Sequence, residues 1–592
     1  MNEFVSYLHS INNMGGSSTG SLAEAQVKSP YFDKVKVDRR LGSYIVESVR
    51  SGQYRTFILT GHAGDGKTSI LVQVLKELSL IQPGEGLSVE REYDGFLYFK
   101  DMSEIPEGQQ VTALKRALEA PSHQKSCLLI SNTGPLLAAF LALAEEKRAI
   151  DGKQLTSDER IALLSRILHQ LDKNEDHEID VEGYNPFLVN IARVDNIYFS
   201  KSIVQKIINP ELWEDCNSCQ CAGRCPIKAN RDQLAKQFDR ICAFIENYYR
   251  YLYENDKRLT IRQIIGQISY ALTGNLSCSS ILKKHYKEPF FNYNFANLFF
   301  GYCGIDPIRS ARQIKGIEQL QLLALDRIAL DIDYQLFVKH DFSCFLPEIA
   351  RELEELNKKY YKHYRISEED LESANTAQHI SIKTRQAIRR FYLMYSLSTE
   401  EQSIDGILNQ IFGDSYTNYI KLIREKQPKQ VLRQLQTTVY QALYMKNVGV
   451  LPGGDEDLPL TLRREGDVFQ NVLLVLGKVS KSKLEVRQRP VQSKLEDVTG
   501  KQSVYLKLND KEFPLTLPMV NYFSNLIAGS IASNNNPALT HGIATLDTIL
   551  LEEFGEPAPD NIDDCELQVI INTTSGQETE RFAFEDKQLT II

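Results

Sequence analysis

A glycine-rich stretch near the start of the chain constrains the fold more than any other feature. Residues 61–68 carry a glycine, four variable positions, a second glycine, a lysine and a threonine. The short apolar run Thr56–Thr60 precedes the stretch, and apolar residues at helical spacing follow it between Ile70 and Leu78. Strand, glycine loop and helix in this order place backbone N–H groups at a helix N-terminus, where they bind phosphate oxygens. This order predicts an α/β core with a phosphate-binding P-loop.

Each residue type in this stretch has a separate expected task. Glycines let the backbone turn tightly, so that its N–H groups face phosphate oxygens. The ammonium group of Lys67 is expected to contact the β- and γ-phosphates of ATP, and the hydroxyl of Thr68 is expected to bind Mg²⁺. We therefore expect ATP and Mg²⁺ as cofactors. The nucleotide-binding residues expected from the stretch are Gly61, His62, Ala63, Gly64, Asp65, Gly66, Lys67, Thr68 and Ser69.

Polar residues after two further apolar runs are candidates for the rest of a hydrolytic site. Asp101 and Glu104 follow the run Phe96–Phe99, and we expect them to hold Mg²⁺ and to activate water, respectively. Asp101 alternatively ends a second strand and has a structural role. Asn132 follows the run Cys127–Ser131, and it either positions the attacking water or caps a turn. The candidate catalytic residues are thus Lys67, Asp101, Glu104 and Asn132.

Arg262 is a further candidate for nucleotide binding. It lies in the first turn of an expected helix over Ile261–Leu272, with Thr260 suited to the N-cap. A guanidinium group matches the geometry of phosphate oxygens. The alternative is an ordinary surface arginine in a first helical turn.

Four of the ten cysteines lie close together in the chain. Such a density of thiols fits a metal site in a reduced compartment better than a disulfide framework. Four thiolates close the coordination sphere of Zn²⁺, which favours a structural zinc site over a catalytic one. An iron–sulfur cluster on the same ligands and unliganded thiols are the alternatives. The expected zinc ligands are Cys216, Cys219, Cys221 and Cys225.

Composition limits the function classes. The chain has 592 residues, 42% of them hydrophobic, with a net charge of −9. It can therefore bury several cores, and its charge argues against coating nucleic acid by bulk electrostatics.

A local DNA surface remains an expectation for the basic stretches Lys358–Arg365 and Lys383–Arg390, although such runs are more often solvated helix faces. Because the first residues lack a signal-peptide pattern and no apolar stretch is long enough to span a bilayer, we expect a cytoplasmic protein without a membrane partner.

A Pro-, Gly- and acid-rich break at Val448–Asp457 is the clearest expected domain boundary. The stretch before it is mostly helical back to about residue 230, and the stretch after it mixes expected strands with a helix. The expected domains are an N-terminal helical or flexible segment (1–34), a P-loop NTPase core (35–210), a Cys-rich metal-binding loop (211–230), a helical lid and helical domain (231–447) and a C-terminal α+β domain (448–592).

Five segments together resemble one family. They are Gly61–Thr68, Lys100–Glu104, Ile130–Gly134, Trp213–Asn230 and Leu259–Arg262. Their arrangement resembles the P-loop protein of bacterial DNA-phosphorothioation-dependent restriction systems, the DptF family. It is also similar to the wider AAA+ and STAND-type ATPases of antiphage defence. The resemblance covers about the first half of the chain.

This resemblance implies an AAA+-like ATPase subunit in which an arginine of the helical lid reaches back to the nucleotide. It also implies an oligomer or hetero-complex with companion restriction proteins, one of them a HerA/FtsK-like motor, which restricts DNA without sulfur in its backbone. DNA is then contacted through the complex. The alternatives are a nucleotide-gated AAA+/STAND-like scaffold or switch with little hydrolysis, and a DNA-binding ATPase of another defence system.

Overall fold

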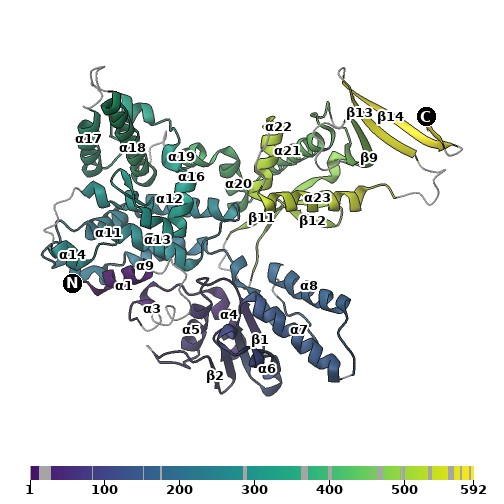
Figure 1. Ribbon diagram of the computed structural model, residues 1–592, viewed down its shortest axis with the longest axis horizontal. Coiled ribbons are helices and arrows are strands. Elements are labelled where there is room, and N and C mark those ends of the chain that lie inside the picture. Colours follow the sequence, from purple (N-terminus) through teal and green to yellow (C-terminus); the bar gives the residue numbers. More distant parts are fainter. Residues whose placement is uncertain are drawn as a thin grey trace. The chain divides into compact units, whose positions relative to one another are not determined.

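The computed structural model divides the chain into two compact units (Figure 1). The first unit comprises Met1–Arg250, Arg258–Ile407 and Ser493–Val498, and the second comprises Tyr251–Lys257, Leu408–Gln492 and Thr499–Ile592. The structure describes residues 2–12, 29–82, 85–150, 152–173, 177–283, 290–361, 371–397, 403–454, 456–462, 471–493, 495, 500–530, 536–557, 566–573, 576–585 and 588–592.

The first unit contains a five-stranded sheet in the order β2-β3-β4-β1-β5. Strand β1 pairs in parallel with β4 and β5, and β3 pairs in parallel with β4. Strand β2 is an antiparallel edge strand on β3. The carboxyl ends of β1, β3, β4 and β5 therefore lie along one edge of the sheet. The strands are Thr56–Thr60 (β1), Glu90–Tyr93 (β2), Phe96–Phe99 (β3), Ser126–Ile130 (β4) and Phe187–Asn190 (β5).

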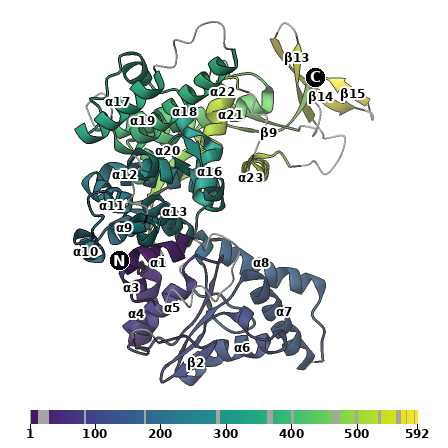
Figure 2. The ribbon, with the colours of Figure 1, turned by 60° about the vertical axis from the view of Figure 1, so that its left-hand side comes forward.

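Helices cover both faces of this sheet (Figures 1 and 2). Successive strand residues point to opposite faces, so Phe57 and Leu59 belong to the core beneath α4 and α5, whereas Ile58 belongs to the core beneath α6, α7 and α8. Burial on both faces explains why the strands are continuous apolar runs without alternation. The helices are Arg40–Arg50 (α4), Lys67–Glu77 (α5), Glu107–Glu119 (α6), Thr133–Ile150 (α7) and Ser157–Lys173 (α8).

Helices make up most of the remaining first unit. Helix α13 begins with a capping box, in which the Thr260 hydroxyl accepts from the N–H of Gln263 and the Gln263 side chain accepts from the N–H of Thr260. Within the described ranges, no helix has the length and apolar character that crossing a membrane requires. The helices are Glu3–Asn12 (α1), Phe32–Val35 (α3), Ser200–Ile207 (α9), Glu214–Asn217 (α10), Pro226–Lys236 (α11), Ile261–Thr273 (α13), Cys278–Lys283 (α14), Phe295–Phe299 (α15), Lys315–Leu323 (α16), Pro347–Tyr361 (α17) and Leu371–Tyr395 (α18). The residues of Phe238–Glu254 (α12) and Ile404–Phe412 (α19) are divided between the two units.

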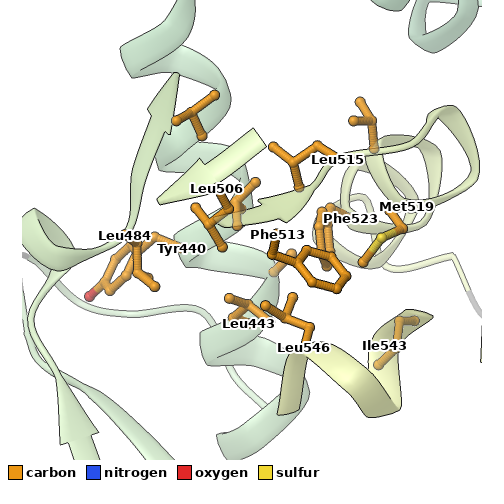
Figure 3. Packing of buried hydrophobic residues seen from close by; sticks show 14 of the residues in the cluster. Tyr440, Leu443, Leu484, Leu506, Phe513, Leu515, Met519, Phe523, Ile543 and Leu546 are labelled. Carbon is orange, nitrogen blue, oxygen red and sulfur yellow. The ribbon is translucent and has the colours of Figure 1, made fainter. Parts of the chain in front are cut away.

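The described part of the second unit combines antiparallel sheets with helices. The sheets have the orders β10-β11-β12 and β15-β14-β13-β9-β8. Figure 3 shows side chains of α21 and α22 packed against β11 and β12 in one apolar core. The elements are Asp414–Arg424 (α20), Lys429–Val448 (α21), Leu458–Leu462 (β8), Val472–Val479 (β9), Glu485–Pro490 (β10), Gln502–Leu508 (β11), Lys511–Pro514 (β12), Leu517–Ile527 (α22), Pro537–Phe554 (α23), Glu566–Thr573 (β13), Gly576–Glu585 (β14) and Gln588–Ile591 (β15).

The expectation of a mixed α/β chain with a parallel sheet is confirmed by these elements. The expected boundary near residue 448 does not coincide with the division into units. Tyr440 and Leu443 of α21 share a core with Leu506 and Phe513 of the C-terminal strands, so α21 packs as part of the second unit. Residues 13–28 of the expected flexible N-terminal segment, and residues 362–370 with part of the basic aromatic stretch, lie outside the described residues.

Candidate functional site

The glycine-rich loop of residues 61–66 connects the carboxyl end of β1 to the first turn of α5. All three of its glycines have positive φ angles, 145° at Gly61, 92° at Gly64 and 92° at Gly66. A Cβ atom at Gly64 would also lie 3.1 Å from Cβ of Arg262, so both the backbone conformation and the available space require glycine here. Because α5 begins at Lys67, the free N–H groups of its first turn lie at the end of this loop.

The side chain of Lys67 contacts the backbone of the 61–66 loop. Its ammonium group donates to the carbonyl oxygens of Gly61 at 2.5 Å and His62 at 3.2 Å. Burial lowers the pKa of Lys67, the carboxylates of Asp65 and Asp101 act to raise it, and the guanidinium of Arg262 lowers it further. In the part of the chain that the structure describes, Lys67 forms no ion pair with a carboxylate. Its positive charge therefore lies beside the loop without an anionic partner in contact.

The buried carboxylate of Asp65 stabilises the loop through hydrogen bonds. Its side chain is fully buried; one carboxylate oxygen accepts from the N–H of His62 at 2.9 Å and the other from Arg258 at 2.9 Å. The same guanidinium donates to the carbonyl oxygens of Ile191 and Val194, which follow β5. Both oxygens of the Asp65 carboxylate thus accept hydrogen bonds from other residues of the chain. Arg258, which the sequence motifs did not single out, joins the loop to the segment before α13.

Arg262 lies over the loop on the first turn of α13. Its N–H donates to the carbonyl oxygen of Gly64 at 3.3 Å. Burial lowers the pKa of the Arg262 guanidinium, and among the described residues no carboxylate pairs with it. Lys67 and Arg262 are therefore two neighbouring cations without anionic partners.

Asp101 and Glu104 follow β3 and have different surroundings. One carboxylate oxygen of Asp101 accepts from the N–H and the hydroxyl of Ser103, at 2.9 and 2.7 Å, and so caps the 3₁₀ turn Met102–Glu104. Asp101 follows β3, whose carboxyl end lies along the same edge of the sheet as the 61–66 loop, and its carboxylate acts to raise the pKa of Lys67. The carboxylate of Glu104 forms an ion pair with Lys100 at 2.8 Å. The second carboxylate oxygen of Asp101 can thus bind another partner, whereas the carboxylate of Glu104 is already paired with Lys100.

Asn132 follows β4, the strand between β1 and β3. Its side chain is exposed, and its carbonyl oxygen accepts from the hydroxyl of Ser131 and from the N–H of Leu136 at the start of α7. The parallel register places the carboxyl end of β4 between the 61–66 loop and Asp101. Lys67, Asp101 and Asn132 therefore follow strands that end along the same edge of the sheet.

Comparison of the chain with family models, curated proteins and solved structures gives no match.

The expected cysteine cluster lies at and before the N-terminus of α11. Cys216 belongs to α10, and Cys225 is the N-cap residue of α11. Cys219 and Cys221 lie in the turns between these helices. Burial raises the pKa of the Cys225 thiol to about 11, while the N–H groups of Lys228 and Ile227 act to lower it. Within the described ranges no three ligand side chains are assembled as a metal site.

Cationic side chains of the second basic stretch, Lys383–Arg390, form ion pairs within the first unit. Each of three positions forms an ion pair with an aspartate, and one pair is fully buried, so these cations are not an open surface for phosphates. The pairs are Lys383 with Asp306 at 2.9 Å, Arg389 with Asp333 at 2.6 Å and Arg390 with Asp326 at 2.7 Å.

Proposed function

We propose that this chain is an ATP-binding and ATP-hydrolysing component of a bacterial DNA restriction complex. The ATP site is formed by the 61–66 loop, the first turn of α5 and Arg262. One observation carries this proposal: two cations, Lys67 and Arg262, flank a glycine loop at the carboxyl edge of a parallel sheet, and neither has a carboxylate of the described residues in contact. A triphosphate supplies the missing negative charge.

The phosphate oxygens are bound by main-chain N–H groups of the loop and of the first turn of α5. Ser69 and Thr68 contribute N–H groups that a helix cannot use internally. Lys67 turns from the carbonyl oxygens of Gly61 and His62 to the terminal phosphates, so an internal hydrogen bond is exchanged for a charged contact. Ala63 and His62 are exposed, and they contribute through their backbone.

The residues present fit a Mg²⁺ ion beside the triphosphate. Across the described chain, the hydroxyl of Thr68 and the second carboxylate oxygen of Asp101 have no hydrogen-bond partner. Oxygen ligands of this kind suit Mg²⁺, which neutralises developing phosphate charge when bound. Asn132 positions the attacking water from the end of β4.

Occupation of the loop is coupled to the helical part of the first unit. The ion pair of Asp65 with Arg258 and the hydrogen bond from Arg262 to Gly64 both join the loop to the segment around the start of α13. When Arg262 binds phosphate oxygens, α13 follows it, and the helical lid changes position with nucleotide state. Companion proteins, including a HerA/FtsK-like motor, respond to this state. This restriction role is proposed from the resemblance of the sequence motifs.

Replacing Arg262 by alanine is expected to weaken ATP binding about tenfold, because one charged contact to phosphate is lost. Arg309→Ala is the control, since Arg309 is an exposed arginine of the same unit. Affinities are measured by titrating a fluorescent ATP analogue in the presence of Mg²⁺. Equal affinities for the two variants would remove Arg262 from the site.

A nucleotide-gated switch with little hydrolysis is the second candidate function. It is favoured by the ion pair of Glu104 with Lys100, which occupies the carboxylate expected to activate water. Turnover at saturating ATP separates the two functions. Hydrolysis that Asp101→Asn abolishes supports the ATPase, whereas tight binding without turnover, even with DNA and companion proteins present, supports the switch.

A further inference from the structure

Exposed cations gather where α20 ends and α21 begins, in the second unit. Residues 415–454 contain six lysines and arginines but a single carboxylate, that of Glu425, although the chain as a whole has a net charge of −9. Five of the six cations lie between residues 421 and 433, and all five side chains are exposed. We call them the α20–α21 basic surface: Lys421, Arg424, Lys426, Lys429 and Arg433.

The cations of this surface lack carboxylate partners. Cations on other helices pair with a carboxylate three or four positions away, as Lys315 does with Glu318 at 2.7 Å and Lys358 with Glu354 at 3.8 Å. Helix α21, by contrast, carries no acidic residue over its whole length. Across the described chain, four members of the basic surface form no ion pair: Lys421, Lys426, Lys429 and Arg433.

Two of these cations occupy an unfavourable part of α21. Lys429 is the first residue of the helix, Arg433 belongs to the following turn, and the first turn contains no acidic residue. The N-terminus of a helix carries partial positive charge, which favours carboxylates and disfavours cations. The positive charge is therefore concentrated where the helix itself repels it, and an anion bound at this surface removes that repulsion.

A second basic segment lies along the same side of α21. Arg433, Gln436 and Tyr440 are three and four positions apart, so they share one face of the helix. The side-chain amide of Gln436 donates to the carbonyl oxygen of Lys481 at 3.0 Å, and the Lys481 ammonium group lies 5.3 Å from the centre of the Tyr440 ring. The 3₁₀ turn Lys481–Lys483 thus adds positive charge to the face that carries Arg433.

We propose that the α20–α21 basic surface binds the phosphate backbone of duplex DNA. A duplex presents a continuous row of negative charges, which matches several unpaired cations on one side of a helix. Gln430 and Gln434 are exposed between the cations and supply uncharged donors to phosphate oxygens. In residues 415–454, all of which the structure describes, no aromatic side chain is exposed, so the surface offers no platform for stacking single-stranded bases.

This surface differs from the stretch where the sequence predicted DNA binding. Cations of Lys383–Arg390 are neutralised by aspartates, whereas those of the α20–α21 basic surface are exposed and unpaired among the described residues. Contacts to phosphates position a protein on DNA without reading its sequence. The proposal does not depend on the ATP site.

The salt dependence of DNA binding tests the surface. A fluorescently labelled duplex is titrated with the chain at several salt concentrations, and binding is followed by anisotropy. The double variant Lys429→Gln/Arg433→Gln is expected to reduce the slope of log K against log salt by about 2 and to weaken binding roughly tenfold. A wild-type chain that shows no affinity for the duplex, or an affinity independent of salt, would overturn the proposal.

Arg487→Gln/Arg489→Gln is the matched control. It removes the same charge from exposed positions of the second unit, but these arginines already pair with Glu485 and Glu512, both at 2.7 Å. The control is expected to keep the wild-type slope, and circular dichroism establishes that both double variants are folded. Equal losses of slope in the two variants would show that overall charge, and not this surface, determines binding.

Two further ligands test the identity of the partner. Single-stranded DNA of the same length and vesicles of phosphatidylserine with phosphatidylcholine are both expected to bind more weakly than the duplex. Tighter binding of either one, lost in Lys429→Gln/Arg433→Gln, would replace the duplex as the occupant. ATP affinity is measured on the same samples and is expected to be unchanged in this variant. A wild-type chain that binds ATP but not DNA would refute the surface alone, and the reverse result would refute the ATP site alone.

Discussion

Replacing Arg390 by methionine will lower the free energy of unfolding of the first unit by about 3–5 kcal/mol, because it leaves Asp326 as a buried charge without its partner. The Arg390 side chain is fully buried and that of Asp326 nearly so. The guanidinium also donates to Asn297 at 3.0 Å and to the carbonyl oxygen of Gly304 at 2.9 Å, and it lies 3.9 Å from the centre of the Tyr302 ring. One side chain thus joins α18 to three other segments.

Arg389→Met is the matched control for this prediction. Arg389 is the preceding residue and pairs with Asp333, but both side chains of that pair are partly exposed, so a smaller loss is expected. Denaturant unfolding is followed by the fluorescence of Trp213, which is buried in the first unit and is the only tryptophan of the chain. The double variant Arg390→Met/Asp326→Leu should recover much of the loss. Equal losses for Arg390→Met and Arg389→Met would contradict the account.

Replacing Lys67 by alanine will weaken ATP binding about a hundredfold, because the site loses its buried charge for the terminal phosphates. Among the described residues, the ammonium group of Lys67 donates hydrogen bonds only to carbonyl oxygens of the loop, so little stability depends on it. A loss of affinity therefore reports on the site and not on the fold.

Lys76→Ala is the matched control for Lys67→Ala. Both lysines belong to α5, but Lys76 is in the last turn and pairs with Asp33. Both variants are compared with wild type by competition of ATP against a fluorescent analogue, and both are checked by thermal melting. Lys76→Ala should bind ATP as wild type does. If Lys67→Ala also binds ATP as tightly as wild type, residues 61–69 are not the site.

Local pattern was enough to predict the central elements of the first unit. The runs Thr56–Thr60, Phe96–Phe99 and Cys127–Ser131 are apolar throughout and end at polar or glycine residues, which is typical of strands buried on both faces. The order of the strands in the sheet depends on contacts between distant segments, so the runs alone could not supply it.

Contacts between distant residues explain what the sequence motifs missed. Asp65 occupies a variable position of the glycine motif, and its partner Arg258 lies 193 residues further along the chain. Arg390 belongs to a run of cations that resembled a solvated face, and only the packing of α18 shows that it is buried. In each case the residue that it contacts is distant in sequence, and the spacing of residues along the chain does not indicate such contacts.

Calorimetric titration of the folded 592-residue chain with ATP and Mg²⁺ tests the central claim most directly. Saturable binding with about one site per chain is predicted, and adenosine, which lacks phosphates, is predicted to give no comparable heat. A chain that is folded by circular dichroism and yet shows no saturable binding of ATP would contradict the proposal that the 61–66 loop and Arg262 hold a nucleoside triphosphate.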